Sequence, residues 1–321
     1  MTPKHIILTL LIMLCPIGMA AQSTITRNKP KPVVTKPKPA AKPKAKPKAK
    51  PAPRRNSTHH SGSTSSTNST SNINSTSSIN STSSISSTTS LSTELNKLIN
   101  NMVYVSGGTF TMGGTSEQGS DACDDEKPTH SVTLSSYYIC KYEVTQALWR
   151  AVMGSNPSKF KGDNLPVETV SWDDCQTFIS RLNSYTSRNF RLPTEAEWEF
   201  AARGGNYSCH YKYSGCNYID DVAWYKINNS HSTHPVGTKQ PNELSLYDMS
   251  GNVYEWCSDR YGSYSSYSQS NPTGPNSGSL RVGRGGSWSI DARGCRSSFR
   301  CGCLPGRSYD DVGLRLVLSQ L

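Results

Sequence analysis

The stretch RLPTEAEWEFAARGG, residues 191–205, carries more fold information than any other segment of the chain. Thr194 supplies an N-cap oxygen, and Glu197 follows three residues later, which is the spacing of a capping box. Trp198 and Phe200 come directly after these signals. The stretch therefore predicts a short helix that starts after Thr194 and places aromatic side chains in a core.

Other elements around this helix can be read in the same way. Thr145 can cap a helix over residues 146–153, and Ser171 can cap a second one over residues 172–182. Residues 102–112 alternate apolar and polar side chains around Ser106-Gly107-Gly108, which predicts a β-hairpin. Further strands are expected at residues 130–139, 280–282 and 312–318. These elements predict one compact α+β domain over residues 94–321.

The first third of the chain has a different character. Residues 1–20 have a cation, an apolar run and small residues at the end, which predicts a signal peptide that is removed on export. Cys15 lies inside this run and raises the alternative of lipidation, although Leu14 precedes it where a small residue is usual. We expect no transmembrane anchor after removal, because the apolar run is too short to span a bilayer.

Two low-complexity segments follow the signal peptide. Residues 21–55 form a linker rich in Pro, Lys and Ala, and residues 56–93 form a Ser/Thr/Asn-rich stalk that we expect to be disordered. Lys4 and the twelve cations of residues 27–55 account for the net charge of +11, because 21 Lys+Arg and 23 Asp+Glu remain elsewhere. The domain is therefore not basic, and no nucleic-acid partner is expected.

The cysteine content favours an exported protein. Nine of the ten cysteines remain after signal removal, and their number in an exported chain indicates disulfides with at least one thiol left over. Cys209 and Cys216 are close enough in sequence to close a small loop. Cys301 and Cys303 are expected to take different partners, and the remaining connectivity cannot be read from the sequence.

Seven motifs occur in an order and spacing that resemble the formylglycine-generating enzyme (sulfatase-modifying factor) family. The resemblance covers roughly residues 100–320 and implies a C-type-lectin-like fold with little regular secondary structure. The motifs are FTMGG (110–114), KYEVTQ (141–146), PVETVSW (166–172), RLPTEAEWEFAARGG (191–205), LYDMSGNVYEW (246–256), RGGSW (284–288) and GLRL (313–316).

The resemblance also implies a copper site, from which this sequence departs. Active members hold copper(I) between two cysteines and oxidise a sulfatase cysteine to formylglycine, and thiolates are the donors that copper(I) prefers. Ser287 matches the family's pocket serine and Cys295 matches its second cysteine, but Ile290 stands at the position of the first. Tyr254 replaces the pocket tryptophan. We therefore expect Cys295 to be a structural cysteine; if activity remains, Cys295, Ser287 and Tyr254 are the candidate catalytic residues and Cys295 is the copper ligand.

Calcium is the second cofactor that the resemblance implies. Asp248, Gly251, Val253 and Glu255 match a calcium loop of the family, and oxygen donors at short spacing on a turn suit Ca²⁺. The alternative is a turn that Asn252 and Glu255 hold by hydrogen bonds without metal. The acidic run of residues 117–126 could also attract a cation, with a solvated loop as its alternative.

Two functions remain open at this stage. The first is a non-catalytic binding or assembly protein of the cell envelope, which recognises a protein or glycan and is periplasmic, associated with the outer membrane or extracellular. Tyrosines of residues 261–267 are candidate contacts for such a partner, with a plain ordered loop as the alternative. The second is an active copper-dependent oxidase whose substrates are exported sulfatases.

Overall fold

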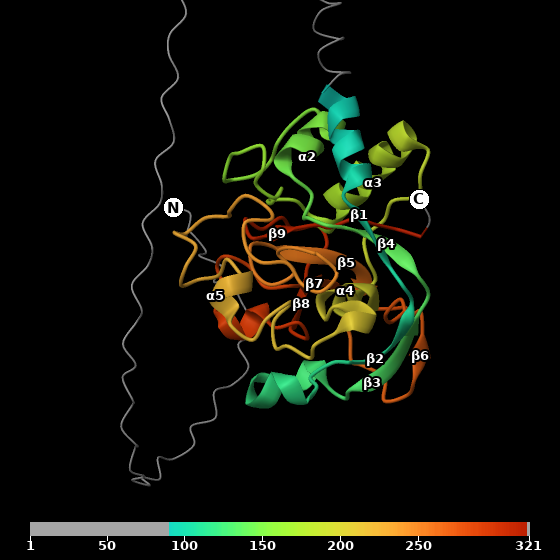
Figure 1. Cartoon of the computed structure of the whole chain (residues 1–321). Coiled ribbons are helices and arrows are strands. Elements are labelled where there is room, and N and C mark those ends of the chain that lie inside the picture. Colours follow the sequence, from blue (N-terminus) through green and yellow to red (C-terminus); the bar gives the residue numbers. More distant parts are fainter. Residues whose placement is uncertain (1–89, 320–321) are drawn as a thin grey trace, which may run out of the picture. The chain divides into compact units, whose positions relative to one another are not determined.

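The computed structural model describes residues 90–319 (Figure 1). The predicted signal peptide, the linker and nearly all of the stalk lie outside the described residues. A helix covers residues 90–100, so regular structure is already present ahead of the predicted domain start at residue 94. No helix within residues 90–319 combines the length and the apolar content needed to cross a membrane.

Two small sheets contain the first strands of the domain, and residues 130–139, expected as one strand, contribute β3 to one sheet and part of β4 to the other. The first has the order β1-β4-β10, with β1 (Met102–Val105), β4 (Tyr137–Cys140) and β10 (Val317–Leu318). The second has the order β2-β3-β6, with β2 (Gly108–Met112), β3 (His130–Leu134) and β6 (Gln269–Ser270). The side chains of β3 alternate between buried and exposed, which confirms the predicted period of two.

The predicted hairpin over residues 102–112 is wrong. β1 pairs antiparallel with β4, and β2 pairs antiparallel with β3, so the two halves of the segment enter different sheets. Gly107 lies at this crossing, where a Cβ atom would be 2.4 Å from the Leu134 carbonyl oxygen. The glycines therefore let the chain bend from one sheet into the next, and each half pairs with a strand that comes later in the chain.

The third sheet has the order β8-β7-β5-β9 and positions the residues of the predicted site. β7 (Arg281–Arg284) lies between β5 (Tyr254–Arg260) and β8 (Arg300–Cys303), and it is antiparallel to both. β9 (Val312–Gly313) runs parallel to β5. The single strand predicted for residues 312–318 is wrong, because the chain leaves the third sheet after β9 and joins the first as β10.

All three predicted helix starts are confirmed. Thr145, Ser171 and Thr194 cap α2 (Gln146–Met153), α3 (Trp172–Thr186) and α4 (Glu195–Ala202), and each side chain accepts a backbone hydrogen bond from the first turn. Such a cap stabilises a helix by about 1 kcal/mol. Figure 1 shows α2 and α3 beside the helix of residues 90–100, with β2 and β3 at the opposite end of the domain. Shorter elements are α5 (Ile219–Val222) and four 3₁₀ turns, at Ser116–Asp121, Asp124–Glu126, Gly205–Tyr207 and Ala292–Cys295.

The helix α4 is buried on every side, although it has three glutamates. Each glutamate meets arginine: Glu195 pairs with Arg300, Glu197 with Arg191, and Glu199 with both Arg203 and Arg284. Because buried carboxylates are tolerated only when they are paired and hydrogen-bonded, these arginines allow α4 to pass through the interior. The described domain is mixed α and β with few long regular elements, as expected from the sequence.

Candidate functional site

The structure brings together the three residues of the predicted pocket. Tyr254 opens β5, Ser287 follows β7, and Cys295 ends a 3₁₀ turn. The Ser287 backbone amide lies close enough to the Cys295 sulfur to lower the pKa of its thiol. The Cys295 thiol in turn contributes to raising the pKa of the Tyr254 hydroxyl. All three residues are buried.

Cys295 is enclosed by apolar side chains. It belongs to a small cluster with Tyr213, Val222 and Tyr225, against which Ile290 packs, and it has no exposed surface. Burial, followed by the charge of Asp291, raises the pKa of the Cys295 thiol well above its usual range. A cysteine binds metal and attacks substrates as the thiolate, so this environment keeps the reactive form scarce.

Ile290 fills the place of the first copper cysteine. A Cβ atom on Gly294 would lie 2.5 Å from Ile290 Cγ1, so the isoleucine side chain lies directly against the turn that ends in Cys295. The Cys295 thiol donates a hydrogen bond to the Asp291 carbonyl oxygen at 3.8 Å. One protonated thiol beside an aliphatic side chain does not fit copper(I), which needs a second sulfur donor here.

The Ser287 hydroxyl is hydrogen-bonded to the carboxylate of Asp311, which could not be identified from the sequence. It donates to Asp311 Oδ2 at 3.0 Å and lies 3.1 Å from Ser289 Oγ, which donates to the same oxygen at 2.7 Å. Burial raises the pKa of Asp311, while the two serine hydroxyls act in the opposite direction. Ser287 is therefore held in place by the segment before β9.

The predicted calcium residues lie in a buried acidic cluster. Asp248 Oδ2 accepts a hydrogen bond from the Gly237 amide at 2.7 Å, whereas its Oδ1 atom is buried without a hydrogen-bond partner. Burial raises the pKa of Asp248 to about 6, and Glu255 contributes in the same direction. Burial and the nearby Asp248 also raise the pKa of Glu143 well above its usual range.

This cluster fits a cation in part. Three carboxylates, those of Glu143, Asp248 and Glu255, lie near Arg315, so negative charge is in excess here. The Asp248 Oδ1 atom, which has no hydrogen-bond partner, is available as a metal ligand. The carboxylate of Glu255 is already used, because Arg315 Nη2 at 2.7 Å and Trp198 Nε1 at 2.7 Å both donate to it. Ca²⁺ binding therefore stays a prediction, centred on Asp248 and on the backbone of the Gly251 and Val253 turn.

The metal-free alternative is present in part, because Asn252 makes hydrogen bonds at the turn whereas Glu255 bonds Arg315 and Trp198 instead. Asn252 Nδ2 donates to Glu143 Oε2 at 2.6 Å, and the Val253 amide donates to Glu143 Oε1 at 3.2 Å. Glu143 thus ties the turn to the segment before α2, a role that the sequence gave no reason to assign.

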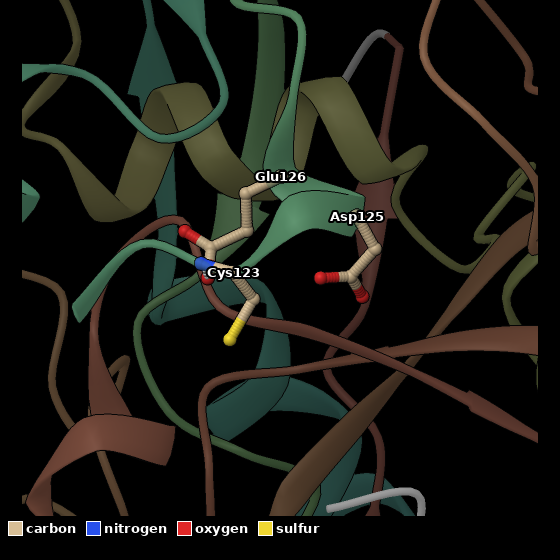
Figure 2. Close-up of side chains that lie close together, drawn as sticks. All are labelled: Cys123, Asp125 and Glu126. Atoms are coloured by element: carbon tan, nitrogen blue, oxygen red, sulfur yellow. Dashed lines mark hydrogen bonds between the residues drawn. The ribbon is translucent and has the colours of Figure 1, made fainter. Parts of the chain in front are cut away.

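The acidic run of residues 117–126 is not a solvated loop. Glu126 is fully buried and pairs with Arg296 at 2.5 Å. Figure 2 shows Glu126 with Cys123 and Asp125, whose ligand atoms lie within 4.8 Å of one another. Each of them already accepts a hydrogen bond: Arg293 donates to Cys123, Arg296 to Glu126, and Tyr261 to Asp125. The group therefore needs no metal ion to balance its charge.

Two of the three tyrosines in residues 261–267 are partly buried by contacts within the domain. Tyr261 donates to Asp125, and Tyr264 donates to Glu195 and packs against His130. Tyr267 is 81% exposed, so it is the one tyrosine of residues 261–267 that a partner could reach freely.

Cys301 and Cys303 lie side by side on β8, with their sulfur atoms 3.7 Å apart. We expected Cys301 and Cys303 to take different partners, whereas the structure places their sulfur atoms next to each other. Within residues 90–319 the structure contains no disulfide, and the predicted loop closure between Cys209 and Cys216 is not formed.

This mixed domain with little regular secondary structure is of the formylglycine-generating-enzyme and C-type-lectin-like class. The chain belongs to the family described as the sulfatase-modifying factor enzyme 1-like domain, whose family model matches residues 88–320.

Several known proteins are similar to the chain. Chaperone protein LppX of Paenibacillus barcinonensis is 34% identical over 277 residues, which cover 69% of this chain and 90% of LppX. The formylglycine-generating enzyme of Streptomyces coelicolor is 30% identical over 283 residues, which cover 66% of this chain and 87% of the enzyme. Among solved structures, Treponema denticola variable protein 1 matches with a TM-score of 0.62 and 33% identity, over 68% of this chain and 95% of that protein.

Proposed function

We propose that the chain is a non-catalytic member of this family that works as a binding or assembly component of the cell envelope. The observation that carries the proposal is the state of Cys295, which is buried in an apolar cluster beside Ile290. A copper oxidase of this family needs two thiolates that can reach the metal, and this pocket offers one protonated thiol. The fold is kept while the donor pair is lost.

The relatives are compatible with a binding role. The similar protein LppX is named a chaperone, and it matches this chain over nearly its whole length. Export remains part of the proposal, supported by the signal-like composition of residues 1–20. The cationic residues 27–55 would then keep the domain near an anionic surface of the envelope.

A hollow beside β2 is the surface best suited to a partner. Its volume is about 680 Å³, and it is lined by hydroxyl, amide and charged side chains, among them Thr109, Thr111, Arg203 and Asn206. β2 is the edge strand of its sheet, so its outer backbone groups can pair with an added strand. A partner protein could therefore bind in extended form along β2, with side chains reaching into the hollow.

The loss of oxidase activity can be tested directly. Purified full-length protein would be incubated with copper(I), oxygen and a peptide containing Cys-x-Pro-x-Arg, and the peptide would be analysed by mass spectrometry. The proposal predicts that the peptide cysteine is unchanged. Formation of the formylglycine aldehyde by the unaltered chain would establish the alternative, an active oxidase.

The binding role has its own test. Reduced and carboxymethylated α-lactalbumin, an extended polypeptide, would be titrated against the full-length protein. Thr111→Arg places a bulky cation in the hollow, whereas Thr177→Arg adds the same charge on the exposed face of α3. We expect Thr111→Arg to weaken binding and Thr177→Arg to leave it unchanged. Equal binding by both variants would remove the hollow from the proposal.

A further inference from the structure

The strand β8 places two thiols on one face. Cys301 and Cys303 are two residues apart in an extended strand, so their side chains point the same way, and their sulfur atoms are 3.7 Å apart. The opposite face is closed at Gly302, where a Cβ atom would lie 2.9 Å from both Leu280 and Tyr261. The glycine thus fixes the register that brings the two sulfurs together.

The neighbouring strand leaves room for this pair. In the β7–β8 ladder, Cys301 stands opposite Gly283 and Cys303 opposite Arg281. A Cβ atom on Gly283 would come within 2.9 Å of Cys301 Sγ, so the absent side chain provides the space that the thiol occupies. The Cys301 thiol donates to the Gly283 carbonyl oxygen at 3.5 Å, and both cysteines are partly exposed.

The pair and Cys295 lie in different apolar clusters, and Tyr254 lies near both. Cys301 and Cys303 pack against the core between α2, α3 and the third sheet, together with Trp172 and Tyr309. Cys295 belongs to a different cluster. The proposed chemistry of Cys301 and Cys303 therefore does not require Cys295.

We infer that Cys301 and Cys303 form a thiol–disulfide exchange site whose substrates are disulfides that link two cysteine residues. The Cys303 thiolate attacks one sulfur of a substrate disulfide, which forms a mixed disulfide and releases the first substrate thiolate. Cys301 then loses its proton and attacks the Cys303 sulfur, which releases the second thiolate. The chain loses two hydrogens and gains one disulfide, while the substrate disulfide is reduced to two thiols.

The pKa values of the two thiols are shifted in opposite directions. The contact with the Cys301 sulfur, in which either thiol can be the donor, is the leading cause that lowers the pKa of Cys303, although burial acts against it. The same contact is the leading cause that raises the pKa of Cys301 well above its usual range, followed by burial. We therefore assign the attack to Cys303 and the release of the mixed disulfide to Cys301, and the two single-cysteine variants below test this assignment.

The strand geometry favours a disulfide that exchanges easily. Residues two apart in a strand have Cα atoms separated by about 6.6 Å, near the upper limit of about 6.8 Å for a disulfide. The bond can therefore form only with some local contraction of β8. Strained and accessible disulfides have more oxidising potentials and are the labile ones.

The site can be tested by a redox titration of the full-length protein. The protein would be equilibrated in mixtures of reduced and oxidised glutathione, quenched with iodoacetamide under denaturing conditions and digested with trypsin. The peptide CGCLPGR, residues 301–307, contains both thiols and no other cysteine. We expect it to lose two hydrogens as the mixture becomes more oxidising, without keeping glutathione. A peptide that stays fully reduced, or that keeps glutathione on both sulfurs, would overturn the inference.

Two variants assign the roles. Cys301→Ser should trap glutathione on Cys303, because no second thiol is present to release it. Cys303→Ser should react about tenfold more slowly with oxidised glutathione, because the more ionised thiol is lost. The control is Cys209→Ser, which removes an exposed cysteine and should leave residues 301–307 unchanged. The same rate in Cys303→Ser as in the unaltered chain would contradict the assignment of the attacking thiol.

A second arm separates small substrates from protein substrates. Insulin would replace oxidised glutathione, and reduction of its disulfides would be followed by mass spectrometry. Oxidation of residues 301–307 by both compounds indicates a site open to protein disulfides, and oxidation by glutathione alone restricts the site to small disulfides. Protection of both thiols from iodoacetamide by Cd²⁺, with no disulfide formed in any glutathione mixture, would instead identify a metal site and overturn the inference.

Discussion

The buried carboxylate of Asp259 gives a quantitative test of the interior electrostatics. Asp259 Oδ2 accepts hydrogen bonds from the Ser258 hydroxyl at 2.9 Å and from the Glu195 amide at 3.1 Å, but no arginine or lysine within residues 90–319 pairs with it. Burial, followed by the charge of Glu195, raises the pKa of Asp259 from 3.8 to about 7. The ionised form is therefore unfavourable in the folded protein.

The sign of the pH effect follows from the raised pKa. Between about pH 4 and pH 7 the folded chain holds this proton while the unfolded chain has lost it, so the free energy of unfolding falls as the pH rises. Above about pH 7 both states are ionised, and the loss is complete. The shift of about three pKa units corresponds to at most about 4 kcal/mol. Asp259→Asn keeps the accepting oxygen and removes the charge, so we expect about 2 kcal/mol of stabilisation at pH 8.5.

Urea denaturation of Asp259→Asn and the unaltered chain would measure this effect. The difference in the free energy of unfolding between them should grow from about pH 5 to about pH 8 and then level off. Asp163→Asn is the matched control, because Asp163 is exposed in its pair with Arg150 and should change stability by less than about 1 kcal/mol. A difference for Asp259→Asn that stays constant with pH would refute the assigned pKa.

Three further results are expected. Arg296→Leu should lower the free energy of unfolding by about 3 to 5 kcal/mol in urea titrations, because it leaves the Glu126 charge buried without a partner. Adding Glu126→Gln should recover part of this loss, and no recovery would contradict the ion-pair account. CaCl₂ should raise the thermal midpoint of the unaltered chain but not that of Asp248→Asn, and an equal rise in both would exclude Asp248 as a ligand. Iodoacetamide should modify Cys295 only after denaturation; native modification as fast as that of Cys209 would show that Cys295 is not enclosed.

Local signals in the sequence predicted the helices well. The caps at Thr145, Ser171 and Thr194 depend on atoms within one turn, so they can be recognised without knowledge of the rest of the fold. The family motifs also predicted that Tyr254 lies near Ser287 and Cys295, which belong to a later segment of the chain.

Features that depend on distant partners could not be predicted in this way. The segment of residues 102–112 alternates as a hairpin would, but its strands pair with β4 and β3 instead. Nothing near Glu126 in sequence shows that Arg296, 170 residues later, neutralises it. The same holds for Asp311, which holds Ser287, and for Glu143, which holds the turn at Asn252.

Copper(I) affinity at Cys295 tests the central claim most directly. It would be measured by competition with a chromophoric chelator in a Cys301→Ser/Cys303→Ser background, so that the β8 thiols do not contribute. With Ile290 intact, we expect no copper(I) bound at Cys295; Ile290→Cys supplies the second sulfur, and an affinity gained there would show that this position alone blocks the site. Copper(I) held at Cys295 while Ile290 is still present would contradict the conclusion that this pocket has lost its metal chemistry.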